Sequence, residues 1–99
     1  MPDHLEGEGA PRRFAVRIAD EFVFGLATVY SQRVLDQIRQ YVILLETSPE
    51  IGSANVRQSL KDRFGEGIRK IPISTFVIVY RFDGETVDVL ALVYGPRIR

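Results

Sequence analysis

The sequence predicts an α+β fold: an N-terminal strand, a helical hairpin and a three-stranded antiparallel meander, with the helices packed on one face of the sheet. Three observations predict it. Apolar residues alternate along residues 14–19, they then recur at helical spacing, and three strand-like segments follow one another between residues 68 and 94. The expected element order is β-α-α-β-β-β, with the three-stranded meander occupying residues 60–97.

The length and composition predict one domain. The chain has 99 residues, of which 45% are hydrophobic, so we expect one core in a single domain over residues 14–99. Residues 1–13 are rich in Gly, Pro and acidic side chains, and are expected to form a disordered acidic tail. The absence of cysteine excludes disulfides, thiolate zinc sites and cysteine nucleophiles. With no apolar run of membrane-spanning length and no secretory signal, we expect a cytoplasmic protein without a membrane partner.

The first elements are a strand and a short helix. Large apolar residues alternate with smaller or charged ones over residues 14–19, which predicts a strand. Asp20 can cap a helix, because its carboxylate can accept hydrogen bonds from the free amides of the first turn. Apolar residues follow at helical spacing: Phe22, Val23, Leu26 and Ala27. Since Gly25 weakens a helix, continuation of the strand to Phe24 stays open as the alternative.

The clearest amphipathic helix follows Ser31, a second N-cap candidate. Its apolar stripe comprises Val34, Leu35, Ile38, Tyr41, Val42 and Leu45. The helix should stop near residues 47–48, because Pro49 disfavours helical geometry in the residue before it. The two helices would form a hairpin that turns near residues 28–31.

Three strands are expected at residues 68–73, 75–82 and 86–94. The middle strand has apolar residues on both faces, which predicts a central strand covered at least in part on both sides. A tight turn is expected at Asp83-Gly84. Pro72 cannot donate to a ladder, so its strand should have an open side there. The last strand should place four side chains on one face: Val87, Val89, Ala91 and Val93.

Several kinds of chemistry are disfavoured by what the sequence lacks. The single histidine, His4, lies in the expected tail, so neither a Ser-His-Asp triad nor a histidine metal site is expected. The glycines at residues 65 and 67 predict a turn and not a phosphate loop, because no Gly-Lys-Ser/Thr follows. We therefore expect no cofactor and no metal.

The remaining candidates for chemistry are basic. The formal net charge of the chain is zero, but residues 57–81 carry six positive and two negative side chains, a local charge of +4. If the meander forms, several of these cations can converge on one sheet face, where Lys and Arg could hold phosphates and stabilise a phosphoryl-transfer transition state. The alternative is that each is a solvated surface charge or part of an ion pair.

Segments in a fixed order point to a known family. After the hairpin come Ser-Pro-Glu-Ile-Gly at 48–52, Leu-Lys-Asp-Arg at 60–63 and Gly-Ile-Arg-Lys-Ile at 67–71. The longest segment is Phe-Val-Ile-Val-Tyr-Arg-Phe-Asp at 76–83, and Tyr-Gly-Pro-Arg at 94–97 follows the last strand. Their order and spacing resemble the RelE/ParE superfamily of toxins from bacterial type II toxin-antitoxin modules. The resemblance implies a cytoplasmic growth inhibitor that a cognate antitoxin protein neutralises.

The resemblance implies two possible activities. RelE-like members cleave mRNA in the ribosome without a metal, and the matching positions here would be catalytic: Lys61, Arg63, Arg81, Arg97 and Tyr94. Further cations would bind RNA: Arg57, Arg69 and Lys70. ParE-like members lack the nuclease residues and inhibit DNA gyrase. Our first expectation is the endoribonuclease, with ribosome and mRNA as partners. A gyrase inhibitor, or an inactive α+β interaction domain, is the alternative.

Two departures from the RelE-like pattern count against mRNA cleavage. The chain is neutral where such nucleases tend to be basic, and it ends at Arg99 without a further helix that would carry catalytic residues. The helical hairpin is the expected antitoxin-binding surface, through Phe22, Val23 and Leu26. The alternative for these three side chains is that they belong to the core.

Overall fold

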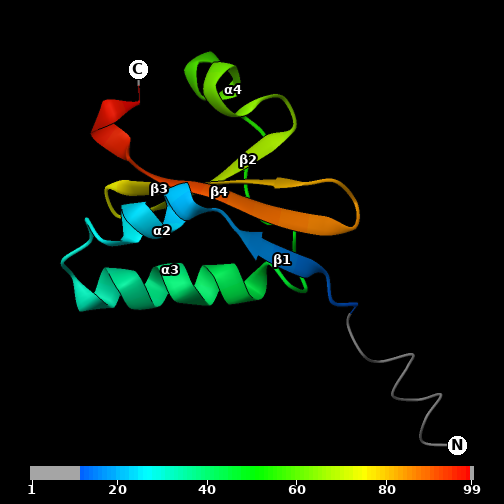
Figure 1. The fold of residues 1–99 in the computed structure, drawn as a ribbon, viewed down its shortest axis with the longest axis horizontal. Helices are drawn as coiled ribbons and strands as arrows, with labels where there is room; N and C mark the ends of the chain where they lie inside the picture. The colour runs from blue at the N-terminus through cyan, green and yellow to red at the C-terminus, as the bar shows by residue number, and fades with distance from the viewer. Residues whose placement is uncertain (1–11, 99) are drawn as a thin grey trace, which may run out of the picture.

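The computed structural model describes residues 12–98 and has the predicted α+β architecture, with one helix more than expected (Figure 1). The elements are, in order, β1 (Ala15–Ile18), α2 (Asp20–Leu26), α3 (Gln32–Leu44), α4 (Gln58–Phe64), β2 (Ile68–Ile73), β3 (Phe76–Phe82), β4 (Thr86–Tyr94) and the 3-10 turn η1 (Gly95–Arg97). Residues 1–11 of the predicted acidic tail lie outside the described residues.

The four strands form one mixed sheet in the order β1-β4-β3-β2. The predicted antiparallel meander is confirmed, because β2 pairs with β3 and β3 with β4 in antiparallel register. β1 adds to β4 in parallel. β2 is an edge strand, as Pro72 predicted, since its missing N–H falls on the open side of the sheet. Elsewhere on that side, Ser53 bridges the backbone of Lys70.

Residues 20–26 form the predicted short helix, α2, so the alternative in which the first strand continues to Phe24 is wrong. Asp20 is the first helical residue and not the cap, because Ala19 occupies the N-cap position and makes no side-chain cap bond. Gly25 serves packing: a Cβ there would lie 2.6 Å from the carbonyl oxygen of Leu92. The glycine that weakens the helix therefore lets α2 lie close against β4.

Helix α3 begins as predicted. The Ser31 hydroxyl accepts a hydrogen bond from the Val34 amide at 3.3 Å, so Ser31 is the N-cap. Ile38 and Leu45 on the apolar stripe are almost completely buried, whereas Tyr41 at the margin of the stripe is 38% exposed. The helix ends at Leu44, followed by turn residues, close to the predicted boundary.

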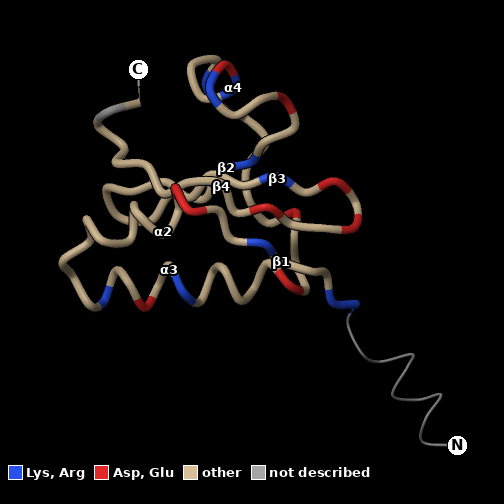
Figure 2. The backbone as a smooth tube through the Cα atoms, in the orientation of Figure 1, with Lys and Arg blue, Asp and Glu red and all other residues tan. Residues whose placement is uncertain are grey.

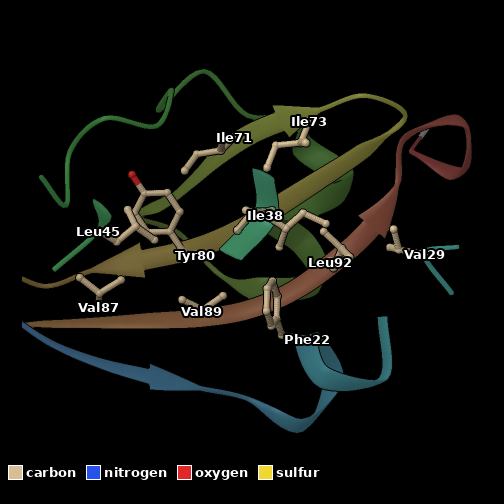
Figure 3. Close-up of a cluster of buried hydrophobic side chains, with 11 residues drawn as sticks. Phe22, Val29, Ile38, Leu45, Ile71, Ile73, Tyr80, Val87, Val89 and Leu92 are labelled. Carbon is tan, nitrogen blue, oxygen red and sulfur yellow. The ribbon is translucent and has the colours of Figure 1, made fainter. Parts of the chain in front are cut away.

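The sheet is covered on both faces by separate hydrophobic clusters. On one face, α2 and α3 pack over a large cluster that includes Phe22, Val29, Ile38, Leu45, Ile71, Ile73, Ile78, Tyr80, Val87, Val89 and Leu92 (Figure 3). On the other face, α4 packs over a smaller cluster of Val56, Leu60, Ile68, Val77 and Val79 (Figure 1). The prediction that the middle strand is covered on both sides is confirmed. The two predicted helices share one face, and α4 covers the opposite one.

Helix α4 corrects the expectation that a meander begins near residue 60. Residues 58–64 are helical, and the first meander strand begins at Ile68. The predicted turn at Gly65-Glu66-Gly67 is present and joins the helix to the strand. Leu60 is buried and Phe64 is half-buried, one turn apart on the face of α4 that meets the sheet.

A bulge in β4 makes the prediction for the last strand wrong beyond Val89. Tyr80 is opposite Val89 and Val79 is opposite Ala91, so Leu90 is the extra residue. Val87 and Val89 therefore belong to the cluster beneath α2 and α3, whereas Val93 packs against the cluster beneath α4. A strict two-residue alternation could not anticipate the inserted residue.

The turn at Asp83-Gly84 is confirmed. The Asp83 carboxylate accepts hydrogen bonds from the amides of Glu85 at 2.9 Å and Thr86 at 2.8 Å. These backbone donors favour the charged form and lower the pKa of Asp83 below its ordinary value.

Candidate functional site

One cleft brings together two of the predicted catalytic residues, Arg63 and Tyr94. It has a volume of about 340 Å³ and lies between α2, α4 and the end of β4. Its lining consists of Glu21, Ser59, Leu60, Arg63, Leu92, Val93, Tyr94 and Ile98. We call it the α2–α4 cleft.

Both predicted residues of the α2–α4 cleft have partners within the chain. The Arg63 guanidinium forms an ion pair with Glu21 and also lies over the Phe64 ring, 4.8 Å from its centroid. The Tyr94 ring packs edge-on against Phe76, with 5.7 Å between centroids, and the residue is 44% exposed. Arg63 therefore joins α4 to α2, and its charge is already balanced by Glu21.

Arg69, which the sequence analysis expected to bind RNA, holds the loop between α3 and α4. Its guanidinium donates to the carbonyl oxygens of Gly52 at 2.7 Å and Glu50 at 3.3 Å. The fully buried Tyr80 side chain holds the same loop, because its hydroxyl donates to the Pro49 carbonyl at 2.8 Å and accepts from the Gly52 amide at 2.9 Å. Burial raises the pKa of Tyr80. We call this arrangement the loop clamp.

Arg81 lies on the α4 side of the sheet and also has a structural partner. Its guanidinium donates to the carbonyl oxygen of Phe64, the last residue of α4. A cation at a helix C-terminus satisfies a carbonyl that has no intrahelical partner and interacts favourably with the helix dipole. Arg81 thus fixes the end of α4 above β3.

The remaining predicted cations, Arg57, Lys61 and Lys70, lie on a different flank of α4. Arg57 and Lys70 line a cleft of about 190 Å³ between α4 and β2. Lys61 lines a neighbouring cleft with Arg69 and Glu66. Figure 2 shows basic positions along α4 and β2. Arg97 belongs to η1, and its side chain lies outside the part of the chain that the structure describes.

The predicted cations therefore do not meet at one point. Arg63 and Tyr94 share the α2–α4 cleft, and Arg69 and Arg81 bond to backbone carbonyls. Arg57, Lys61 and Lys70 lie on the flank of α4 that faces β2. The sequence contained no signal for the partners that these side chains have within the chain. Glu21, which the sequence analysis did not single out, is the acidic residue that neutralises Arg63.

The predicted antitoxin-binding residues differ in accessibility. Phe22 is 3% exposed and belongs to the core, and Leu26 is half-buried against it. Val23 is 49% exposed. The most exposed apolar residue of α2 is Phe24, at 71%, which the sequence analysis did not select. Its position could have been inferred, because two residues of helix turn a side chain about 200° away from a buried Phe22.

A second cleft adjoins Phe24. Its volume is about 380 Å³, and it is lined by Glu21, Phe24, Gly25, Thr28, Phe76, Leu92 and Tyr94. It shares Glu21, Leu92 and Tyr94 with the α2–α4 cleft. The two clefts therefore meet beside Tyr94, where exposed aromatic rings from α2 and β4 border a mostly apolar lining.

Within residues 12–98, no group of three or more His, Cys, Asp or Glu side chains could hold a metal ion. No helix in that range is long and apolar enough to cross a membrane. The described side chains therefore offer cations, aromatic rings and apolar clefts.

The sequence of this chain matches a family model, and its fold matches a solved structure. The family model described as the ParE toxin of the type II toxin-antitoxin system, parDE, matches residues 11–98. Among solved structures, a chain of the RelBE2 toxin-antitoxin complex from Mycobacterium tuberculosis superposes with a TM-score of 0.64 at 20% identity, covering 83% of this chain and 98% of that one. At this identity the likeness concerns the fold. No curated protein matches the chain.

Proposed function

The chain belongs to the ParE toxin family of type II toxin-antitoxin systems, and from this premise we propose that it stops growth by binding DNA gyrase and not by cleaving mRNA. As a toxin of such a system it has a cognate antitoxin as partner. Gyrase is the target that resemblance to the ParE-like branch implies. A protein that acts on gyrase acts in the cytoplasm, so the proposal includes that location.

The observation that carries this proposal is that three arginines that a nuclease would use are bonded to other groups of the chain. Arg63 pairs with Glu21, Arg69 holds two loop carbonyls, and Arg81 bonds to the end of α4. A metal-free nuclease needs cations and a proton-transfer group around one phosphate. Cations already bonded within the chain would have to leave these partners first. A toxin that acts by binding its target needs no such convergence.

The activity can be tested by expressing the toxin without its antitoxin. We expect lost supercoiling activity of purified gyrase, together with DNA breaks in cells and intact mRNA. Codon-phased mRNA cleavage with normal supercoiling would contradict the proposal. Coexpression of the antitoxin is the control and should restore growth.

Tyr94→Phe separates the two mechanisms within the same fold. The substitution keeps the ring that packs against Phe76 and removes only the hydroxyl. A nuclease that used this hydroxyl would lose most of its toxicity. The gyrase mechanism predicts toxicity within about twofold of the unmodified toxin, since surface changes of this size cost less than about 0.5 kcal/mol.

The antitoxin is expected to bind over the exposed side of α2. Val23 and Phe24 are solvent-exposed there, and the cleft beside Phe24 offers an apolar lining for an inserted side chain. Phe24→Glu should weaken antitoxin binding by at least about tenfold, because a carboxylate would replace a buried aromatic contact. The matched control is Ile43→Glu, at an exposed apolar position of α3. Equal losses for both variants would argue against this surface.

A further inference from the structure

Three cations line the side of α4 that faces β2. Arg57, at the N-cap position of α4, and Lys61 are four residues apart and so lie on the same side of the helix. Lys70 of β2 lies opposite, and with Arg57 it lines one cleft over Leu60 and Val77. We call Arg57, Lys61 and Lys70 the β2-side cations.

The β2-side cations have no ion-pair partner among residues 12–98, in contrast to Arg63 on the other side of the same helix. The lining of the Arg57–Lys70 cleft includes no carboxylate, and the neighbouring cleft beside Lys61 includes Glu50 and Glu66, neither of which forms an ion pair with it. Lys61 and Lys70 are half-buried. Partly buried, unpaired cations close to one another reduce stability, because each loses hydration without gaining an opposite charge. Such an arrangement suits an anion supplied from outside.

The surroundings of these cations indicate which kind of anion. A row of separate cations matches a ligand with repeated negative charges, which a nucleic-acid backbone has. Single-stranded RNA is usually held through aromatic rings on which its bases stack. No aromatic side chain lines the Arg57–Lys70 cleft, the half-buried Phe82 beside Lys61 packs edge-on against Phe14, and the exposed rings of Phe24 and Tyr94 belong to the clefts beside α2. The chemistry therefore fits phosphate contacts to a duplex.

We propose that Arg57, Lys61 and Lys70 bind the phosphate backbone of duplex DNA, so that the toxin contacts gyrase and its DNA segment together. The choice of DNA rests on the proposed function, because gyrase holds a DNA duplex. The contact is independent of sequence, since cations that reach only phosphates read no base edges.

The expected signature is a salt dependence. Three phosphate contacts give a slope of about −2.7 for the logarithm of the affinity against the logarithm of salt concentration, so affinity falls about 40-fold between about 50 and 200 mM salt. Removing one of these cations should reduce the slope by about 1.

The test measures binding of the full-length toxin to a short labelled duplex of mixed sequence over a salt series. The test variant combines Arg57→Gln, Lys61→Gln and Lys70→Gln. The matched control removes the same amount of charge elsewhere, through Arg12→Gln, Arg33→Gln and Arg39→Gln. We expect the test variant to lose nearly all of the salt dependence, and the control to keep it.

Several outcomes would overturn the proposal: an unchanged slope in the test variant, an equal loss in both variants, or tighter binding of single-stranded RNA than of duplex DNA. A loss of antitoxin affinity without a loss of DNA affinity would assign the surface to a protein partner, and would also overturn it. If the triple variant folds poorly, Arg57→Gln alone at this exposed position should still change the slope by about 1.

Gyrase inhibition, measured in parallel, separates this inference from the proposed function. If the unmodified toxin binds DNA through these residues but does not inhibit gyrase, the DNA-binding surface is upheld and the proposed function fails. If the test variant inhibits gyrase as well as the unmodified toxin does and neither binds DNA, the surface is refuted and the proposed function is upheld.

Discussion

The loop clamp makes Tyr80→Phe the most informative single substitution in the fold. The change removes one oxygen atom and leaves the aromatic ring within the core. That oxygen donates to the Pro49 carbonyl at 2.8 Å and accepts from the Gly52 amide at 2.9 Å. Tyr80, Pro49 and Gly52 are all buried, so the two backbone groups would lose their partner where water has little access.

The expected cost follows from these two groups. Leaving a buried donor or acceptor unsatisfied costs about 1–3 kcal/mol for each group, so Tyr80→Phe should lower the free energy of unfolding by about 2–6 kcal/mol. In a domain of this size that corresponds to a fall in Tm of about 10–30 °C. Urea unfolding, with the slope of the transition unchanged, measures the loss directly.

Tyr30→Phe is the matched control, because the chemical change is identical and Tyr30 is 94% exposed. Its free energy of unfolding should change by less than about 0.5 kcal/mol. A loss in Tyr80→Phe no larger than in the control would refute the reasoning, because it would mean that Pro49 and Gly52 find water or other partners at little cost.

The raised pKa of Tyr80 predicts a pH dependence for the same position. A folded-state pKa above the unfolded value of about 10.0 means that the protonated phenol stabilises the fold below that pH. This contribution is lost as the pH rises through the folded-state pKa. The unmodified protein should therefore lose stability above about pH 10 more steeply than Tyr80→Phe, and parallel alkaline melting curves would contradict this.

Three further substitutions test other parts of the fold. Gly52→Ala should lower stability by about 1–3 kcal/mol, because the new Cβ would lie 2.7 Å from the Tyr80 ring and hydroxyl; an unchanged urea midpoint would show that the loop moves freely. Ser31→Ala should cost about 1 kcal/mol through loss of the α3 N-cap, measured by thermal unfolding, and Ser31→Asp should recover most of it. Asp83→Ala should lower Tm at neutral pH. The pKa of Asp83 is lowered in the folded state, so its carboxylate stabilises the fold at every pH above the ordinary pKa of 3.8. That contribution disappears as the pH falls through the folded-state pKa, so a Tm difference that persisted in strong acid would be evidence against the assignment.

The sequence predicted the elements with a clear apolar pattern, including the equally short α2, and missed α4 because its apolar pattern is sparse. Seven residues supply only two apolar positions on one face, Leu60 and Phe64, and Arg57 provides no side-chain cap. An indirect signal was present. The alternation in β3 placed Val77 and Val79 on the second face of the sheet, so some element had to cover them. Counting uncovered apolar strand positions would have located α4 between the hairpin and the meander.

The candidate site was less predictable, because each arginine acquires its role from a residue far away in the chain. Arg63 and Glu21 are 42 residues apart, and Arg81 bonds to a backbone carbonyl of a helix that the sequence did not reveal. Residue types indicate which side chains can hold a phosphate. Only tertiary placement shows which of them are already neutralised within the chain.

The basic residues fall into two groups, those bonded to groups of the chain and those without an ion-pair partner among the described residues, and this difference bears on the mechanism. Arg63, Arg69 and Arg81 bond to groups of the chain itself, so removing any of them should perturb the loop or helix that it holds. Arg57 and Lys70 hold no element in place and border a cleft without a carboxylate. Within one fold, then, three of the arginines at nuclease-like positions hold the loop and helices in place, whereas Lys61 lies with Arg57 and Lys70 on the other side of α4. That separation fits the proposed binding mechanism, in which the antitoxin binds the apolar surface beside α2 and the phosphate backbone of DNA binds the basic surface beside β2.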